Sequence, residues 1–324
     1  LHDLVDKPHI VNNQNIEANN FLASSEASNH RNLYFINQLN LFPQITSTYI
    51  GLEDGSFIGA NRSTKGYLQL LLSDKSTQNN LHYYQIDDGS GTKIKLLNAF
   101  SKFDPRVRSW YKEAIQTKTA GWSKIFVDFV LQSLVITASR PILGKEGQAL
   151  GVSGTSFYLF RINRFLENLK IGKSGETYII ERNGLLVGTS TSDPLFKKIN
   201  EKIKRTDATE SDNELIRKTS RFIQNKFITF SAINKSQQLE LEIGDDKQYV
   251  QVSPFKTENG LDWLIVVIIP ESDFMAQVNN NRLMMLIFIC FALVISILIS
   301  IVVAKWVTRP ILHLNKTAAS IVNG

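Results

Sequence analysis

The amino-acid sequence predicts an α+β fold with a long N-terminal helix, two antiparallel-sheet modules in tandem, and one very apolar helix. Two observations lead to this prediction. Short β-rich runs, such as residues 134–143 and 263–270, are separated by turn residues, which is typical of antiparallel sheets. A helical pattern over residues 158–169 divides these runs into two groups, so we expect one sheet on each side of it.

The composition is that of a globular protein of about two domains. The chain has 324 residues, of which 43% are hydrophobic and 20% are charged, and this balance excludes a disordered chain. Lys and Arg exceed Asp and Glu by six charges that are spread along the sequence, which argues against a nucleic-acid binder. The single cysteine, Cys290, excludes an intrachain disulfide framework and zinc sites built on several thiolates.

The first residues are polar and are expected to form a stalk helix. Leu33, Ile36 and Leu39 make an apolar stripe there at helical spacing. Turn signals such as Asp54-Gly55 then mark the hairpins of the sheet modules. The predicted boundaries are 1–42 for the stalk helix, 43–170 and 171–281 for the two modules, 283–304 for the apolar helix and 305–324 for the tail.

The apolar helix from Leu283 to Ala304 is expected to cross a membrane. Its 22 residues carry no charge and would span about 33 Å, against about 30 Å for a hydrocarbon core. The alternative, a buried core helix, is seldom this long without a charge. Because cations gather after the helix, the positive-inside rule places residues 305–324 in the cytoplasm and residues 1–281 outside the inner (plasma) membrane. Export needs a signal, so we expect the chain to begin downstream of a first transmembrane helix.

The densest chemical cluster is the run FDPRVRSWYKEA. The planar guanidinium of Arg108 can hold a carboxylate with two parallel hydrogen bonds. Trp110 and Tyr111 add the apolar surface and polar tips that small-ligand pockets use. A purely structural corner, in which Arg108 pairs with Asp104 or Glu113, explains the same spacing, and the residues alone leave both interpretations open.

No catalytic, metal or cofactor site is expected in this chain. The run GKSGET at residues 172–177 looks like the end of a phosphate-binding loop, but Glu167 stands where the first glycine of that loop belongs. We therefore expect a turn into a strand. The five histidines are scattered, and Asp87 and Asp88 fit a turn better than a metal site.

The run from about Phe42 to Phe274 resembles the double Cache (dCache) extracellular sensor domain of bacterial receptors. The stretch KIGKSGETYIIERNGLLV is most similar to cyanobacterial multidomain receptors. The tail from Val307 to Gly324 is similar to the start of a HAMP linker. The other matching stretches are YIGLEDGSFIGANR, FDPRVRSWYKEA, GWSKIFVDF, LVITASRPI and ALGVSGTSF.

This resemblance implies two PAS-like modules, of which the membrane-distal one binds the ligand and the proximal one relays the signal. In the amino-acid-sensing subgroup, the Arg–x–Trp–Tyr motif of the pocket falls on Arg108, Trp110 and Tyr111 of this chain. The arginine and its neighbours there hold the ligand carboxylate, and acidic residues hold the amine. Asp128 stands at the position of one of these acids.

Three positions depart from that subgroup. Ser156 replaces the second acid, and Phe103 and Phe126 replace aromatic residues with hydroxyls. A ligand ammonium would be poorly compensated in such a desolvated pocket. We therefore expect a small metabolite, a carboxylate or an amino-acid-like compound, held by Arg108, and a standard α-amino acid is disfavoured.

The expected function is the ligand-sensing input of a transmembrane signal-transduction receptor that signals through its membrane helix to HAMP. The expected partners are a small-molecule ligand, the membrane and, by the resemblance, a second copy in a homodimer. Three alternatives stay open. The intact protein is a signalling enzyme (histidine kinase, adenylate or guanylate cyclase, or diguanylate cyclase) with its catalytic domain after residue 324, or it is a chemoreceptor. A membrane-anchored scaffold without a ligand would instead show a sealed, apolar pocket around Arg108.

Overall fold

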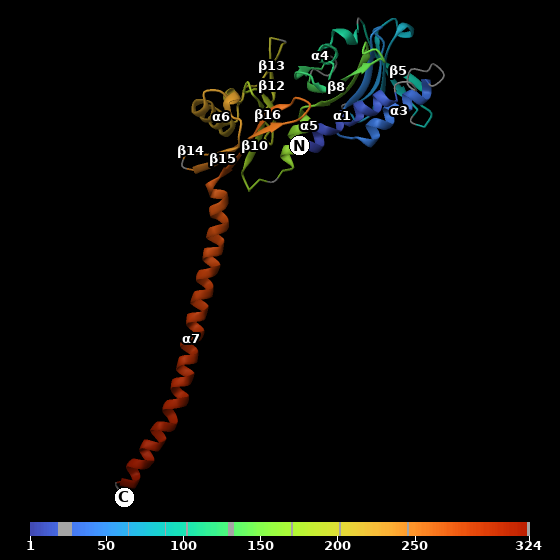
Figure 1. Cartoon of the computed structure of the whole chain (residues 1–324). Helices are drawn as coiled ribbons and strands as arrows, with labels where there is room; N and C mark the ends of the chain where they lie inside the picture. The colour runs from blue at the N-terminus through green and yellow to red at the C-terminus, as the bar shows by residue number, and fades with distance from the viewer. Residues whose placement is uncertain are drawn as a thin grey trace.

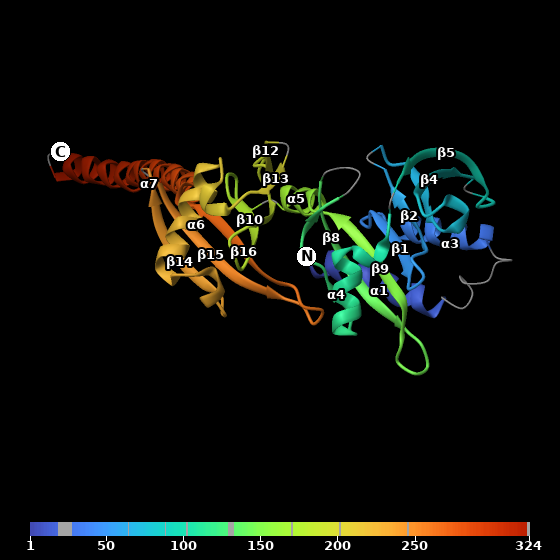
Figure 2. The same cartoon turned by 90° about the horizontal axis from the view of Figure 1, so that it is seen from above.

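The computed structural model describes residues 1–18, 28–63, 65–87, 89–101, 103–128, 133–169, 171–200, 202–244 and 246–322, and the side chains within these ranges outside 274–283 and 307–322. Figures 1 and 2 show two sheet units beside each other and one long helix, α7, that leaves the second unit. The two larger sheets are antiparallel, which confirms the predicted α+β class.

The strands of the first sheet lie in the order β5-β4-β3-β2-β1-β9-β8-β6, and β7 pairs with β8. Strands β1 to β5 follow one another as hairpins, and β9 returns to pair with β1, so β1 and β9 lie at the centre of the sheet. The predicted Asp54-Gly55 turn joins β1 to β2. The strands are β1 (Ser47–Leu52), β2 (Phe57–Arg62), β3 (Leu68–Ser73), β4 (Leu81–Ile86), β5 (Lys93–Phe100), β6 (Gly121–Trp122), β7 (Phe126–Val127), β8 (Leu134–Leu143) and β9 (Ala149–Tyr158).

Two helices cover one face of this sheet. Helix α1 (His2–Glu17) packs on β8 and β9, and α3 (Ser28–Leu41) packs on β2 and β3. The expected helix over residues 1–42 is therefore present as two helices, and residues 19–27 lie outside the described part of the chain. Ile36 and Leu39 of the predicted apolar stripe are fully buried beneath the sheet. Both helices belong to the packed layers of the first unit and do not form a free stalk.

The contact between α1 and the sheet is polar at its centre. Asn12 donates to the carbonyl oxygen of Ala138 at 2.8 Å and accepts from the Ser153 hydroxyl at 3.0 Å. Asn15 donates to the Thr48 hydroxyl at 2.9 Å. Both asparagine side chains are fully buried. Asn12 and Asn15 thus form a buried hydrogen-bonded layer directly behind β1 and β9.

The second unit is built on a smaller sheet in the order β11-β10-β16-β15-β14. A separate two-stranded ribbon, β12-β13, and helix α6 occupy the charge-rich region around residues 195–222. Tyr178 lies fully buried in this unit, where its hydroxyl is 2.8 Å from Ser220 Oγ of α6. The elements are β10 (Glu176–Glu181), β11 (Leu186–Thr189), β12 (Phe196–Ile199), β13 (Lys202–Arg205), α6 (Glu214–Phe227), β14 (Gln237–Ile243), β15 (Asp246–Lys256) and β16 (Asp262–Pro270).

One hydrophobic cluster joins the two units. It contains Val5 of α1 and Leu134 of β8, passes through Ile162 of the connecting helix α5 (Phe160–Glu167), and continues to Val266 of β16. The predicted module boundary at residue 170 falls just after α5. The hydrophobic core continues across this boundary, so the division into two modules stays a prediction.

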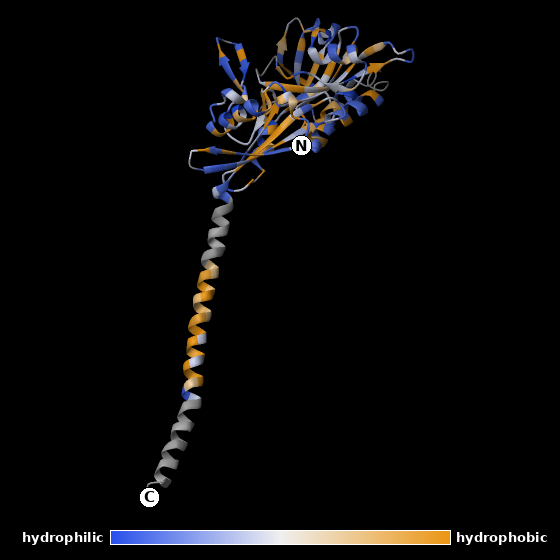
Figure 3. Ribbon diagram, turned by 60° about the vertical axis from the view of Figure 1, so that its left-hand side comes forward, coloured by the Kyte–Doolittle hydropathy of each residue, from blue (hydrophilic) through white to orange (hydrophobic). Residues whose placement is uncertain are grey.

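Helix α7 (Glu271–Val322) begins directly after β16. Its stretch Met284–Trp306 is long and apolar enough to cross a membrane, is entirely unburied, and agrees with the predicted span 283–304. Figure 3 shows this stretch as a continuous hydrophobic band on a helix that stands apart from both sheets. The apolar side chains of the band are exposed, which is expected of a helix that lies in lipid.

The first turn of α7 is attached to the loop before β10. The Asp273 carboxylate accepts from the backbone N–H groups of Lys173 and Ser174 at 2.7 and 2.8 Å, and from the Ser174 hydroxyl at 2.8 Å. Gly172 has a φ of +65°, and a Cβ there would come within 2.4 Å of Asp273 Oδ2. The run GKSGET is therefore the predicted turn into a strand, and the anion that it holds is a side chain of the same protein.

Candidate functional site

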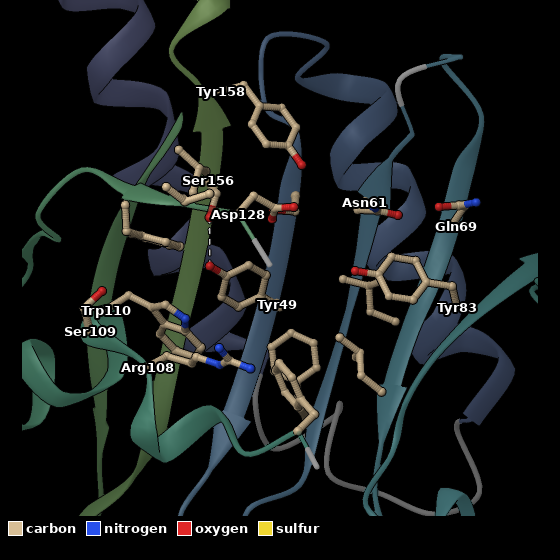
Figure 4. A pocket seen from close by; sticks show the side chains of 18 of the residues that line it. Tyr49, Asn61, Gln69, Tyr83, Arg108, Ser109, Trp110, Asp128, Ser156 and Tyr158 are labelled. Atoms are coloured by element: carbon tan, nitrogen blue, oxygen red, sulfur yellow. Dashed lines mark hydrogen bonds between the residues drawn. The ribbon is translucent and has the colours of Figure 1, made fainter. Parts of the chain in front are cut away.

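A cavity of about 460 Å³ lies on the face of the first sheet that α1 and α3 leave uncovered (Figure 4). The corner after β5, formed by a 3₁₀ turn (Pro105–Val107) and helix α4 (Ser109–Thr117), covers one side of it. The segment from Phe126 to Asp128 covers another side. This volume lies within the range of about 300–1,000 Å³ that is usual for small-molecule pockets.

Two glycines of the sheet make room for the aromatic side chains of the site. A Cβ at Gly154 would come within 2.3 Å of the Tyr49 ring, and one at Gly51 would come within 3.1 Å of the Trp110 ring. With only hydrogen atoms at these two positions, both rings can approach the strands closely. Their centroids are 4.9 Å apart, and the pair forms an aromatic floor.

A row of polar side chains crosses the sheet beside this floor. Direct cross-strand pairing links Gln69 to Asn61, Asn61 to Ser47, Ser47 to Ser156, and Ser156 to Thr137. All of these except Thr137 line the cavity. Since paired residues on neighbouring strands project from the same face, five strands present one continuous line of hydrogen-bonding groups.

Tyr49 connects the floor to this row. Its hydroxyl lies 2.8 Å from Ser156 Oγ and 3.3 Å from Thr137 Oγ1, and these two oxygens are 2.7 Å apart. Burial raises the pKa of Tyr49 to about 12, although both hydrogen bonds act to lower it. The Asp128 carboxylate also raises the pKa of Tyr49, and the Arg108 guanidinium lowers it. Both charged side chains therefore act on the same buried hydroxyl.

The two charged groups of the cavity come from different covering segments. Arg108 extends from the corner into the cavity (Figure 4), and its guanidinium lies 5.0 Å from the centre of the Phe103 ring. The corner also has an ion pair of its own, because Asp104 accepts from Arg106 at 2.8 Å. Arg106 further donates to the carbonyl oxygen of Glu53 at 3.1 Å. The corner is thus fastened by Arg106, and Arg108 lines the cavity.

Six of the seven side chains predicted for the site line this one cavity: Arg108, Trp110, Asp128, Phe126, Ser156 and Phe103. The seventh, Tyr111, does not line it. Tyr111 is buried in the hydrophobic cluster that also contains Tyr49 and Trp110, with its ring centroid 5.7 Å from that of Trp110. That these residues bind a ligand stays a prediction.

Sequence reasoning missed most of the side chains that the strands supply. Tyr49, Asn61, Gln69, Tyr83 and Tyr158 all line the cavity. The sequence shows which residues alternate along each strand. It does not show how the strands pair, and that pairing places these side chains on one face of the sheet. Burial raises the pKa of Tyr83 and Tyr158, and the Asp128 carboxylate raises both further, so these hydroxyls also remain neutral donors.

A second cavity, of about 450 Å³, lies between the two units and is lined by Trp122 and Trp263. Three of its charged side chains are paired: Arg182 donates to Asp262 at 2.6 Å, and Glu181 pairs with Arg205 of β13. Within the described ranges, no group of three or more His, Cys, Asp or Glu side chains could hold a metal ion.

A sheet with an open, charged and aromatic cavity, joined to a candidate membrane helix, is the layout of a ligand-sensing input domain of a membrane receptor. The dCache_1 family model, a Cache domain, matches residues 9–278 of the chain. The chain therefore belongs to the dCache family of sensor domains.

Curated relatives are methyl-accepting chemotaxis proteins. McpG of Pseudomonas putida is 24% identical over 159 residues, which are 48% of this chain and 24% of McpG. McpC of Bacillus subtilis is 25% identical over 214 residues, which are 65% of this chain and 28% of McpC. The chain thus spans under a third of the length of these relatives.

Solved structures that are similar to this one include two chemoreceptor domains. One is the ligand-binding domain of the Pseudomonas aeruginosa amino acid chemoreceptor PctB in complex with L-Arg (19% identity, TM-score 0.43, 84% of this chain and 94% of that chain). The other is the ligand-binding domain of the Campylobacter jejuni chemoreceptor Tlp3 in complex with L-valine (14% identity, TM-score 0.43, 78% and 77%). At TM-scores below 0.5, these likenesses say nothing about the ligand of this chain.

Proposed function

We propose that the cavity between Arg108 and Asp128 is the ligand site of this sensor domain and that it binds a small, polar metabolite carrying a carboxylate. One observation carries the proposal. Among the described residues that line the cavity, Arg108 and Asp128 are the two with a charge, and aromatic rings surround them. Charges of opposite sign held in a partly apolar cavity match a ligand that has a carboxylate at one point and a hydrogen-bond donor at another.

The donor group of the ligand is proposed to lie near Asp128. Ser156, in place of a second acid, bonds to Tyr49 and Thr137 and supplies no charge. A single carboxylate balances one positive charge at most, so a neutral donor or a single amine fits here. A ligand with several cationic groups does not fit, because its excess charge would be desolvated without a partner.

We further propose that α7 carries the signal across the inner membrane, with residues 1–281 outside and residues 305–324 inside as the start of a HAMP linker. The support is geometric: α7 is one continuous helix from the end of β16 to Val322, and Asp273 attaches its first turn to the loop before β10. Any shift of the second unit would therefore move the helix. Signalling of this kind needs a two-state element, and a homodimer of such helices would supply it.

For the intact protein we favour a chemoreceptor over a kinase or cyclase, because the curated relatives are methyl-accepting chemotaxis proteins. The scaffold alternative predicts a sealed, apolar pocket around Arg108. The observed cavity is lined by Asp128, Asn61, Gln69 and several hydroxyl groups, and this lining favours a sensor.

A ligand screen with two arginine variants tests the proposal. The chain, held in detergent micelles, is heated with amino acids, small carboxylates, amines and purines. A compound present at 100 times its Kd should add about 2.7 kcal/mol to the free energy of unfolding and raise the Tm. Arg108→Ala should abolish the shift. Arg221→Ala, which removes an exposed arginine of α6 in the second unit, should keep it. A hit that survives Arg108→Ala would contradict the assignment of the carboxylate site.

A further inference from the structure

The side of the cavity away from the corner carries a pair of amides. Asn61 on β2 and Gln69 on β3 face each other directly across the two strands, and both line the cavity. Figure 4 shows them on the opposite side of the cavity from Arg108 and Trp110. The corner residues pack over β1, where Gly51 meets Pro105 and Trp110. Strands β2 and β3 lie one and two strand spacings from β1, about 5 and 10 Å, so the amide pair is a separate contact point.

This amide pair has an unused hydrogen-bonding group. The side-chain oxygen Oδ1 of Asn61 is buried and has no hydrogen-bond partner among the described residues. A buried polar atom of this kind is uncommon in folded proteins, because losing its bonds to water is not compensated. A donor supplied by a ligand would compensate it.

The amide side of the cavity is polar but uncharged. Its described lining consists of Asn61, Gln69, Leu71, Tyr83 and Asn98, and Tyr83 pairs across the strands with Asn98. Burial raises the pKa of Tyr83, so its hydroxyl is neutral as well. The Asp128 carboxylate acts on the Tyr83 hydroxyl from outside this group of residues. A charged ligand group placed here would lose its water without an opposite charge in this lining, whereas a neutral group with donors and acceptors would be satisfied.

We propose that Asn61 and Gln69 form a second recognition point for a neutral hydrogen-bonding group at the far end of the ligand. The class of ligand is then an elongated carboxylate that ends in a carboxamide, ureido or hydroxyl group. This inference rests on the proposed function, because it takes the carboxylate to be held at Arg108. It makes the amide pair the element that selects among ligands with the same head group.

The test uses probes that share one carboxylate and differ only at the far end. Glutaramate, glutarate, 5-aminopentanoate and hexanoate end in a carboxamide, a carboxylate, an ammonium and a methyl group. L-glutamine, L-glutamate, L-ornithine and L-norleucine repeat this series with an α-amino group. Calorimetry on the chain in detergent micelles gives the Kd of each probe. In at least one series, the carboxamide should bind about 5- to 100-fold more tightly than the methyl probe, the range expected for satisfying a buried hydrogen-bonding group.

Three variants assign that preference to the amide pair. Asn61→Leu and Gln69→Leu should reduce the carboxamide-to-methyl ratio of affinities towards one. Asn61→Asp should move the preference to the ammonium probe. Gln251→Leu makes the same substitution on an exposed strand position of the second sheet and should keep the ratio. Because the readout is a ratio within one variant, a general loss of stability does not imitate the expected result.

The outcomes separate the two proposals. An unchanged ratio in Asn61→Leu, a charged or methyl probe that binds best to the unaltered chain, or no binding by any probe would overturn the amide recognition point. The carboxylate site is tested by Arg108→Ala, which should weaken all probes of a series by a similar factor. If that variant binds normally while Asn61→Leu loses the ratio, the amide recognition point stands and the proposed carboxylate site fails.

Discussion

At the scale of single residues, the cavity depends on Tyr49. Its ring lies on Gly154 and against Trp110, and its hydroxyl closes a ring of hydrogen bonds with Ser156 and Thr137. The hydroxyl is fixed and neutral, and both cavity charges act on it. Hydrogen-bond donors held in place before a ligand arrives lose little entropy on binding, which favours affinity and selectivity.

A second buried residue, His9 of α1, predicts how stability depends on pH. Burial and the nearby Arg140 guanidinium lower the pKa of His9 from 6.5 to about 4. Its ring packs edge-on against Trp122 at 5.1 Å, and among the described residues neither ring nitrogen has a hydrogen-bond partner. The folded protein therefore favours the neutral imidazole of His9. Its contribution to stability is complete above pH 6.5 and is lost as the pH falls from 6.5 through 4.

We expect His9→Phe to remove this loss. Between pH 7 and pH 4 the unaltered chain should lose about 3 kcal/mol more of its free energy of unfolding than the variant does. Each unit by which the pKa of His9 is lower in the folded than in the unfolded chain corresponds to about 1.4 kcal/mol. Urea unfolding followed by tryptophan fluorescence measures both. Equal losses in the two proteins would show that His9 is not the group responsible.

The residues that share the cavity were predictable from the sequence where they are neighbours in the chain. Phe103, Arg108 and Trp110 lie within eight positions, and a local pattern is enough to group them. Asn61 and Gln69 became neighbours only through the register of β2 and β3. A shift of one residue in that register would turn one of them to the other face, and no local pattern excludes it.

At the scale of elements, α1 is the layer behind the cavity. The strand residues that it contacts alternate with those that line the site: Thr48 lies between Ser47 and Tyr49. Thr155 likewise precedes Ser156 and donates to Asn12 at 2.8 Å. A change in the spacing of β1 and β9 on the cavity side would therefore reach α1 through buried hydrogen bonds.

We expect Asn12→Ala to destabilise the first unit by about 2–3 kcal/mol. The variant leaves the carbonyl oxygen of Ala138 without its side-chain donor and deprives the hydroxyls of Ser153 and Thr155 of their acceptor. Gln14→Ala, on the exposed side of the same helix, should change the free energy of unfolding by less than about 0.5 kcal/mol. Urea unfolding compares the two. A small effect of Asn12→Ala would mean that water replaces the lost amide.

The junction with α7 offers a second prediction at this scale. Hydrogen bonds from the backbone of Ser174 and Lys173 hold the pKa of Asp273 below its ordinary value, so the contact persists at neutral pH and is lost as the pH falls through that lowered pKa. Asp273→Ala should speed hydrogen exchange at the amides of Lys173 and Ser174. The amide of Ser56, which bonds to Asp54 in a distant turn, is the internal control. Unchanged exchange at residues 173 and 174 would contradict the attachment.

The arrangement of elements shows which features local patterns predict and which depend on distant parts of the chain. The apolar helix and the hairpin at Asp54-Gly55 are local features, and both were predicted correctly. Residues 1–18 were expected as part of a polar stalk helix over residues 1–42, whereas Asn12 and Asn15 lie buried against the first sheet. Their partners, Ala138, Ser153 and Thr48, lie far away in the sequence, and burial of a polar side chain follows only from such partners.

At the scale of the whole molecule, the cavity and the membrane span lie at opposite ends of a continuous structure. Strands β8 and β9 pass from the cavity floor into the shared hydrophobic cluster, which continues through α5 to β10 and β16. From β16 the chain enters α7 without a break. Ligand binding in the first unit therefore has a packed route to the membrane helix, although coupling along it requires two alternative arrangements of these elements.

Two cavities of similar volume compete for the role of ligand site, and a structure of the chain with a ligand from the thermal screen decides between them. We predict ligand density on the first sheet, with a carboxylate oxygen within hydrogen-bonding distance of Arg108 and the far end of the ligand near Asn61. Density between Trp122 and Trp263 instead, with the first cavity unchanged, would contradict the central claim that Arg108 and Asp128 define the sensor site.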